Sequence, residues 1–129
     1  MKKTELLLLF IFTLLSAVYS KLYSQQPIRI VCVGNSITEG FGNTSEEAAW
    51  PAQANKLLGN RYAFSNCAVS GTTMFKNSNA PYWKTERYAK AKSLNPQILI
   101  IALGTNDADP WRWNSLKNEF KSDYLDMVK

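Results

Sequence analysis

The chain has 129 residues, which is enough for one domain once any leader is set aside. Hydrophobic residues make up 46% and charged residues 19%, a composition that excludes an intrinsically disordered chain. The formal net charge of +5 comes partly from Lys2 and Lys3, and the other cations are scattered, so no nucleic-acid partner is expected. The sequence contains no histidine, which excludes every mechanism in which this chain supplies its own imidazole.

The amino-terminal segment has the three-part pattern of a secretory signal peptide. Two lysines precede the uncharged apolar stretch Leu6–Val18, which ends in small residues. This stretch is shorter than the roughly 20 apolar residues that a membrane-spanning helix needs. We therefore expect residues 1–20 to be a cleaved leader, with cleavage after Ser20 or as late as Ser24. The mature protein would be periplasmic or secreted without a stable membrane anchor, and an uncleaved anchor is the alternative.

Two cysteines, Cys32 and Cys67, lie in apolar, strand-like segments. Export would permit a disulfide between them. A bridge needs its two α-carbons within about 7 Å, whereas a buried free thiol simply packs as a small hydrophobic group. We expect two free structural thiols, and neither has a histidine in this chain to activate it.

Strands and helices are predicted to alternate along the chain. Apolar and β-branched segments predict strands at residues 28–33, 61–69 and 97–103. Apolar residues at steps of three and four predict helices at residues 50–58, at 82–94, and from Trp113 to the chain end. Residues 72–81 are expected to form a polar loop. The third strand is apolar on both faces, as is typical of a central strand covered by helices on both sides.

This alternation predicts the fold class α/β, with a doubly wound, flavodoxin-like parallel sheet between two helical layers. Residues 25–129 are expected to hold only part of this three-layer domain, about three strands. A wholly apolar strand left at the edge of so small a sheet would be unstable. The last helix also has no stop signal before Lys129. We therefore expect the domain to continue beyond this sequence.

A short polar motif follows each predicted strand. The three motifs are Gly34-Asn35-Ser36-Ile37-Thr38, Ser70-Gly71-Thr72-Thr73 and Gly104-Thr105-Asn106-Asp107. The carboxyl ends of parallel strands bind ligands in doubly wound sheets, so the three motifs are expected to meet there. A serine, a glycine N–H and an asparagine carboxamide at one rim would supply a nucleophile and donors for an oxyanion.

Each of these three residues also has a purely structural interpretation. Ser36 could cap the turn that follows it, Gly71 could serve a positive backbone angle, and Asn106 could close an Asx turn. Other motifs fail on spacing, because no lysine follows Gly40 as a P-loop requires and Thr38 stands where a Gly-x-Ser-x-Gly elbow needs glycine. Without histidine or closely spaced cysteines no metal site is predicted, and no cofactor is expected.

Taken together, the motifs resemble the first three sequence blocks of the SGNH (GDSL) hydrolases, which is the amino-terminal portion of that superfamily. The matching blocks are Gly34-Asn35-Ser36-Ile37-Thr38-Glu39-Gly40, Asn66-x-Ala68-x-Ser70-Gly71-x-Thr73 and Gly104-Thr105-Asn106-Asp107. They stand in the right order at the predicted strand ends, and they cover nearly everything after the leader. Within the superfamily the chain is most similar to exported bacterial carbohydrate esterases of the sialate O-acetylesterase or acetylxylan esterase kind. The segment Pro81-Tyr82-Trp83-Lys84-Thr85 adds to this similarity.

The resemblance implies that Ser36 is the nucleophile of a serine ester hydrolase. Its own N–H, the N–H of Gly71 and the side chain of Asn106 would form the oxyanion hole, and the substrate would be a carbohydrate carrying acyl groups, in particular acetyl. Three features depart from the family. Asn35 replaces the usual aspartate, Ala68 stands at a position that is often glycine, and the last block, Asp-x-x-His, has no counterpart. The base is therefore expected past Lys129, and the 129-residue chain alone is expected to be inactive.

Aromatic and acidic residues near the predicted rim complete the candidates. Trp83 and Trp111 could stack on a sugar ring, whereas Trp113 belongs to the apolar stripe of the last helix and suits the core. Asp107 and Asp109 suit the organisation of the turn and the capping of that helix. Two other functions stay open: a noncatalytic carbohydrate-binding or scaffold protein, and a lipid or thioester acyl hydrolase with the same site. The sequence indicates neither the sugar nor an oligomeric state.

Overall fold

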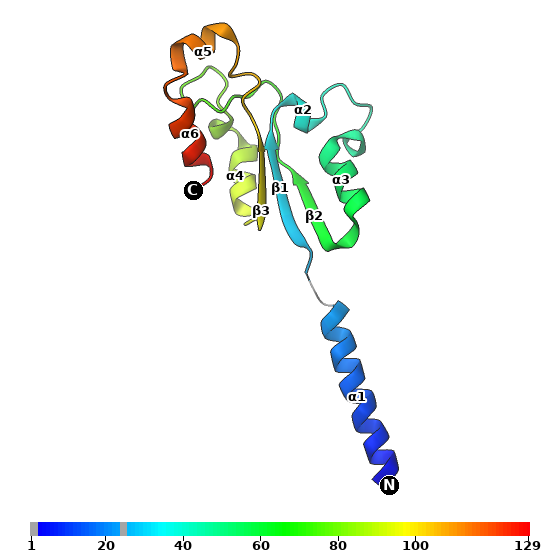
Figure 1. Ribbon diagram of the computed structural model, residues 1–129. Helices are drawn as coiled ribbons and strands as arrows, with labels where there is room; N and C mark the ends of the chain where they lie inside the picture. Colours follow the sequence, from blue (N-terminus) through cyan, green and yellow to red (C-terminus); the bar gives the residue numbers. More distant parts are fainter. Residues whose placement is uncertain (1–2, 24–25) are drawn as a thin grey trace.

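A parallel three-stranded sheet forms the centre of the molecule, as seen in a computed structural model that describes residues 3–23 and 26–129 (Figure 1). The strands are β1 (Ile28–Gly34), β2 (Tyr62–Asn66) and β3 (Ile98–Ala102). Their order is β2-β1-β3, so the chain crosses first to one side of β1 and then to the other. The predicted α/β class with its doubly wound parallel sheet is confirmed.

Helices that follow β1 cover both faces of the sheet, and α1 (Lys3–Tyr23) precedes the sheet in the chain. The helices after β1 are α2 (Ser36–Glu39), α3 (Trp50–Leu58), α4 (Glu86–Ser93), α5 (Pro110–Leu116) and α6 (Phe120–Met127), with 3-10 turns η1 (Glu46–Ala48), η2 (Gly59–Arg61) and η3 (Tyr82–Lys84). α3 lies on one face, and α4 and α6 lie on the other (Figure 1). Right-handed crossovers that run in opposite directions from β1 require this arrangement. None of the described helices is long and apolar enough to cross a membrane.

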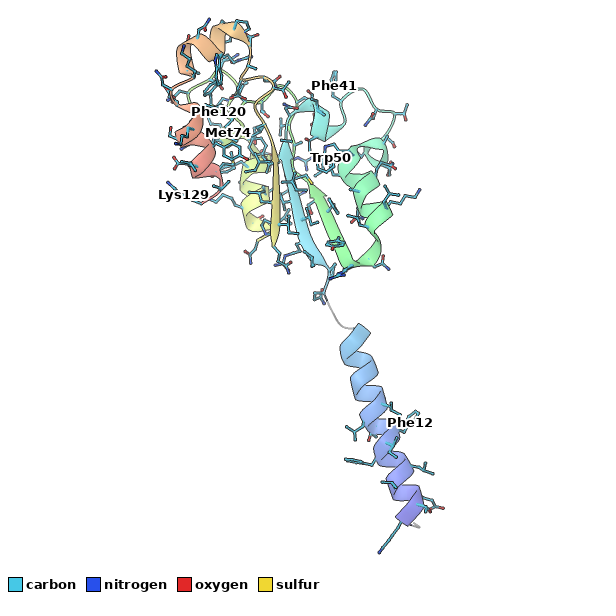
Figure 2. All side chains as sticks on the ribbon, in the orientation of Figure 1. Phe12, Phe41, Trp50, Met74, Phe120 and Lys129 are labelled. Carbon is cyan, nitrogen blue, oxygen red and sulfur yellow. The ribbon has the colours of Figure 1, made fainter. Side chains whose placement is uncertain are left out.

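The main core lies between the sheet and the layer of α4 and α6. Val31 and Val33 of β1 are 1% and 2% exposed, and they pack with buried residues of the loops and helices: Cys67, Met74, Tyr82, Ala91 and Met127. The fully buried Tyr82 donates its hydroxyl to the Cys67 carbonyl at 2.5 Å, and burial raises its pKa. Figure 2 labels Met74 of this core and Phe120, the first residue of α6, which packs against it.

Two predicted helices are each interrupted in the structure. The helix predicted at 82–94 is divided into η3 and α4 by Thr85, whose extended backbone and side chain cap α4 by accepting the Tyr88 N–H at 3.2 Å. The helix predicted from Trp113 onward is divided into α5 and α6 by a turn in which Glu119 N–H donates to Leu116 O at 2.8 Å. Periodicity did not reveal either break, because apolar residues recur at helical steps on both sides of it.

The second and third strands also differ from their predictions. β2 ends at Asn66, three residues early, because the Asn66 side chain accepts the Ala68 N–H at 3.1 Å and turns the chain. β3 stands at an edge of the sheet and not at its centre. Ile98 and Leu99 point to opposite faces and are 42% and 39% exposed, so neither face of β3 is fully covered within this chain.

Trp113 contributes less to the core than predicted, because it is 40% exposed. Its ring still contacts Phe75 and Phe120, with centroids at 6.2 and 5.7 Å. The amino end of α5 agrees with the prediction, since Asp109 caps it by accepting the Trp111 N–H at 3.2 Å. Trp113 and Phe120, which follow the third motif in the chain, therefore form an aromatic cluster with Phe75.

Charged contacts join α6 to the loop that contains Lys76. Lys76 Nζ lies 2.5 Å from Asp126 Oδ2, and Lys129 Nζ donates to Asp126 Oδ1 at 2.8 Å. The hydrogen bonds from Lys129 and then Lys76 lower the pKa of Asp126 to about 2. The Lys76 N–H also donates to the buried carboxylate of Asp123 at 2.9 Å. α6 therefore depends on charged contacts as well as on Met127.

We expect the attachment of α6 to weaken in acid. The folded-state pKa of Asp126, about 2, lies below its ordinary value of 3.8, so its stabilising effect is complete above pH about 4 and is lost as pH falls through about 2. Asp126→Asn should remove this part of the pH dependence. Urea unfolding midpoints between pH about 2 and 5 would measure it, and identical pH profiles for the two proteins would contradict it.

The thiols of Cys32 and Cys67 are free and fully buried, as predicted. Burial, and then the neighbouring Cys67, raise the pKa of Cys32 to about 11, so its thiolate is scarce at neutral pH. We expect iodoacetamide at pH about 8 to modify neither cysteine in the folded protein and both after unfolding in urea. Mass spectrometry would count the adducts, and rapid modification of the folded protein would contradict this burial.

Candidate active site

Three loops at the carboxyl ends of the strands form the candidate site: the first loop (residues 35–42), the second loop (67–75) and the third loop (103–109). Hydrogen bonds join each of the first two loops to the last residue of the strand that leads into the other. Val69 N–H donates to Gly34 O at 3.0 Å, and Asn66 Nδ2 donates to Thr38 O at 2.8 Å. The convergence predicted from parallel strand ends is therefore present between these two loops.

The second and third loops are joined through the side chains of Asn106 and Asp107. Asn106 Nδ2 donates to Thr72 O at 2.8 Å. The Asp107 carboxylate is fully buried and accepts the N–H groups of Met74 and Phe75, at 2.9 and 2.8 Å. Asp107 was predicted to organise its own turn, but in the structure it secures the neighbouring loop. All three predicted motifs thus form one connected rim.

Ser36 is the first residue of α2 and is not its cap. Asn35 caps the helix, because its side-chain oxygen accepts the Ile37 N–H at 3.1 Å. The Ser36 hydroxyl makes no hydrogen bond within residues 3–23 and 26–129, and the side chain is half-buried. A Cβ on Gly34 would come within 2.3 Å of Thr38 Oγ1, so glycine is needed for α2 to start directly at the end of β1. The serine hydroxyl is free to react.

The three predicted oxyanion donors are also available. Within the described chain, the N–H groups of Ser36 and Gly71 have no acceptor. Asn106 Nδ2 carries two hydrogens and donates to Thr72 O, which leaves its second hydrogen available. Gly71 has φ +77° with open space around it, so its positive angle explains why it is glycine while leaving its N–H exposed. Donors of this kind stabilise a negative oxygen.

Asn106 does not close an Asx turn. The local turn is closed by the Ala108 N–H, which donates to Gly104 O at 3.0 Å. Arg112 Nη1 donates to the Asn106 carbonyl at 3.0 Å and holds its backbone. The carboxamide is therefore free to reach across to the second loop, where it donates to Thr72 O.

The two tryptophans proposed for substrate binding differ in their surroundings. Trp83 donates its indole N–H to Met74 O at 2.7 Å, packs 5.2 Å from the Tyr88 ring and has Lys76 Nζ 4.5 Å from its centroid. These contacts give Trp83 a packing role. Trp111 is 57% exposed, with the Arg112 guanidinium 4.8 Å from its ring centroid. A sugar-stacking role stays a prediction for both residues.

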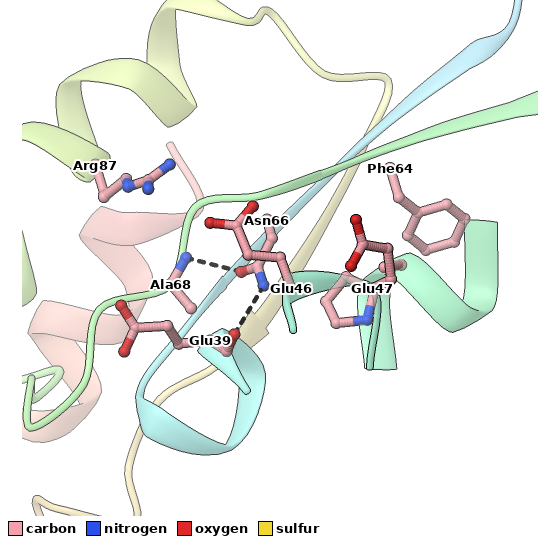
Figure 3. A pocket seen from close by; sticks show the side chains of 9 residues that line it. Glu39, Glu46, Glu47, Phe64, Asn66, Ala68 and Arg87 are labelled. Atoms are coloured by element: carbon pink, nitrogen blue, oxygen red, sulfur yellow. Dashed lines mark hydrogen bonds between the residues drawn. The ribbon is translucent and has the colours of Figure 1, made fainter. Parts of the chain in front are cut away.

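Sequence reasoning missed the contact between Glu39 and Ser70. The Glu39 carboxylate accepts the Ser70 N–H at 2.9 Å and also the Ser70 hydroxyl. Glu39 also lines a pocket of about 320 Å³ beside α2, together with Glu46, Glu47 and Arg87 (Figure 3). No group of three acidic, cysteine or histidine side chains in the described residues is arranged to hold a metal ion. No local sequence signal connects Glu39 with a residue 31 positions away.

Residues 32–129 match the GDSL-like Lipase/Acylhydrolase family. The chain belongs to this family. Among curated proteins, an acetylxylan esterase from Xylanibacter ruminicola (strain ATCC 19189 / DSM 19721 / CIP 105475 / JCM 8958 / 23) is 37% identical over 106 residues. The aligned region covers 81% of this chain and 22% of that relative. The resemblance seen in the three motifs is confirmed.

Among solved structures, one likeness supports the fold alone. A mutant of the esterase AlinE4 superposes with a TM-score of 0.57 at 20% identity, covering 81% of this chain and 54% of that one. TesA matches with a TM-score of 0.47 at 22% identity, over 74% of this chain and 55% of TesA. The chain thus spans about half the length of these structures and about a fifth of the curated relative.

Proposed function

We propose that this chain is the amino-terminal, nucleophile-bearing portion of an exported serine ester hydrolase that removes acetyl groups from a carbohydrate. The observation that supports it is the free hydroxyl of Ser36 at a rim shared with the Gly71 N–H and the Asn106 carboxamide. Family membership supports ester hydrolysis. The similarity to an acetylxylan esterase supports an acetylated polysaccharide as the substrate.

The proposed reaction begins when Ser36 Oγ attacks the ester carbonyl carbon and its proton passes to a base. The carbonyl oxygen becomes negative and accepts hydrogen bonds from the Ser36 N–H, the Gly71 N–H and Asn106 Nδ2. Each such donor typically lowers the barrier by about 3 kcal/mol. Collapse of the intermediate breaks the C–O bond to the sugar, and the sugar oxygen takes the proton. Water then attacks the acyl-enzyme, releases the acid and restores Ser36.

The base is proposed to come from a segment outside this sequence. None of the 129 residues is histidine, and neither Asp123 nor Asp126 begins an Asp-x-x-His pattern. Loss of the base of a catalytic triad lowers turnover by orders of magnitude even when the oxyanion donors remain. The chain by itself is therefore proposed to be inactive.

Hydrolysis assays on two proteins test this proposal. The 129-residue chain and the longer gene product that contains it would be compared with an aryl acetate and with acetylated xylan. Background turnover by the short chain and release of acetate by the longer product are the expected results. Turnover by the short chain equal to that of the longer product would contradict the external base, and absence of ester hydrolysis by both would contradict the proposed function.

A lipid or thioester acyl hydrolase is a second candidate, because exposed apolar side chains flank the nucleophile. Ile37 is 67% exposed and Phe41, labelled in Figure 2, is 80% exposed. Such side chains could contact an acyl chain as well as a sugar face. Turnover of esters from two to twelve carbons would separate the candidates, since a deacetylase loses activity as the chain lengthens. Binding of xylo-oligosaccharides without turnover would favour the noncatalytic alternative.

Export is part of the proposal and rests on the amino-terminal sequence. The two lysines, the uncharged stretch Leu6–Val18 and the small residues up to Ser20 form a secretory signal peptide pattern. The mature protein should begin after Ser20, or as late as after Ser24, and should fractionate with the periplasm or the medium. Amino-terminal sequencing of the purified protein would test this, and an intact Met1 would contradict it.

A further inference from the structure

A carboxylate at the end of the nucleophile helix contacts the loop that carries the second oxyanion donor. Ser36 is the first residue of α2 and Glu39 is its last. The Glu39 Oε2 atom accepts both the Ser70 N–H, at 2.9 Å, and the Ser70 hydroxyl. Ser70 immediately precedes Gly71, whose N–H points to no acceptor in the part of the chain that the structure describes. The Glu39 side chain therefore links the helix that begins with Ser36 to the residue that precedes Gly71.

The position of Gly71 depends strongly on its neighbours. Apart from its two chain neighbours, no heavy atom lies within 4 Å of the place where its Cβ would be, so no side chain packs on that side of Gly71. On one side, Val69 N–H is bonded to Gly34 O at 3.0 Å, and on the other the Thr72 N–H reaches Val69 O at 3.4 Å. Between these points the backbone N–H of Ser70 is held by Glu39. Among the contacts that the first loop makes with the second, the contact from Glu39 to Ser70 is the one nearest in sequence to Gly71.

We propose that Glu39 is a positioning residue that sets the Gly71 N–H relative to Ser36. This inference rests on the proposed function, because it assigns Glu39 to the same oxyanion site. A donor displaced by about 1 Å can slow catalysis by up to about a hundredfold. The Gly71 donor acts on charge that develops in the transition state, so its displacement lowers kcat more than it raises KM.

The pocket beside α2 supplies both a competing interpretation and a matched control. Glu39 lines it with Glu46, Glu47 and Arg87, so a carboxylate there could instead contact the substrate directly (Figure 3). Direct contact would appear as a raised KM. Glu46 is exposed, lines the same pocket and makes no side-chain bond to the second loop in the described residues. Glu46→Ala therefore removes a pocket carboxylate without touching Ser70.

The test uses the longer gene product that hydrolyses esters, with Glu39→Ala, Glu39→Gln, Ser70→Ala and Glu46→Ala. We expect Glu39→Ala to lower kcat by about ten- to a hundredfold with KM within about twofold. Glu39→Gln keeps an oxygen that accepts from Ser70 and should recover most of kcat. Ser70→Ala should lower kcat by about threefold, and adding it to Glu39→Ala should cause no further loss, because both act through one contact. Glu46→Ala should match the unchanged protein.

Several results would overturn this inference. They are an unchanged kcat in Glu39→Ala, a raised KM with normal kcat, an equal loss in Glu46→Ala, or a Gln variant as impaired as the Ala variant. If Glu39→Ala does not fold, as judged by thermal unfolding, Glu39→Asp, which draws the carboxylate back from the Ser70 N–H by one carbon, takes its place, and an unchanged kcat in that variant overturns the inference. Ser36→Ala keeps the two proposals separate. Full activity of Ser36→Ala would contradict the proposed function, whereas its inactivity beside a fully active Glu39→Ala would contradict the role of Glu39 alone.

Discussion

Ser36→Ala is expected to reduce ester hydrolysis by about a thousandfold or more in the longer protein that we propose contains this chain. The change deletes the atom that attacks the substrate, and oxyanion donors alone leave only a small residual rate enhancement. The Ser36 hydroxyl makes no hydrogen bond in the described residues, and Asn35 supplies the cap of α2, so the fold should be retained. Turnover of an aryl acetate and of acetylated xylan would measure the loss, with circular dichroism to check folding.

A second serine-to-alanine change serves as a control for effects that do not depend on the nucleophile. Ser93 of α4 is exposed, and its hydroxyl donates to Lys90 O at 2.8 Å. Ser93→Ala should keep kcat within about twofold, because its hydroxyl bond lies within an exposed helix. A folded Ser36→Ala protein that retained more than about a tenth of the activity would show that another residue is the nucleophile.

Asp107→Ala is expected to lower the free energy of unfolding by about 2–6 kcal/mol. The carboxylate is fully buried and accepts the N–H groups of Met74 and Phe75. Removing it leaves two backbone donors without partners, each at about 1–3 kcal/mol. The second loop would lose its attachment to the third. Urea unfolding of the purified proteins would measure the change.

Asp109→Ala is the natural control, because it alters the same residue type two positions away. Asp109 caps α5 through the Trp111 N–H, and losing such a cap typically costs about 1 kcal/mol. The ratio of the two effects tests whether Asp107 acts through the second loop. Equal and small losses in the two variants would contradict that role.

Local signals predicted the elements that depend on local chemistry. The first strand was predicted at 28–33 and extends over Ile28–Gly34, because its β-branched run ends at a glycine. α3 extends over Trp50–Leu58 as predicted, with Pro51 in its first turn and Gly59 as its cap. The capping of α4 by Thr85 was missed, since a threonine inside a helical pattern is also compatible with a continuous helix.

The candidate site likewise has a part that the sequence predicted and a part that it did not. The motifs around Ser36, Gly71 and Asn106 were recognisable because each follows its own strand, and parallel strands bring their carboxyl ends to one edge. The bonds that hold the rim in place were not recognisable. Glu39 contacts Ser70 across 31 positions, and Asp107 contacts Met74 across 33 positions.

By itself, the sequence determined the α/β class and the family and predicted the candidate site residues, because these predictions follow from hydrophobic periodicity and short motifs. The same sequence, with no histidine, also indicated that the base is not among its 129 residues. Only the tertiary structure decided which carboxylates hold the loops together. Hydrogen bonds between distant residues depend on the folded path of the backbone, and a periodic pattern carries no information about which side chains meet across a sheet end.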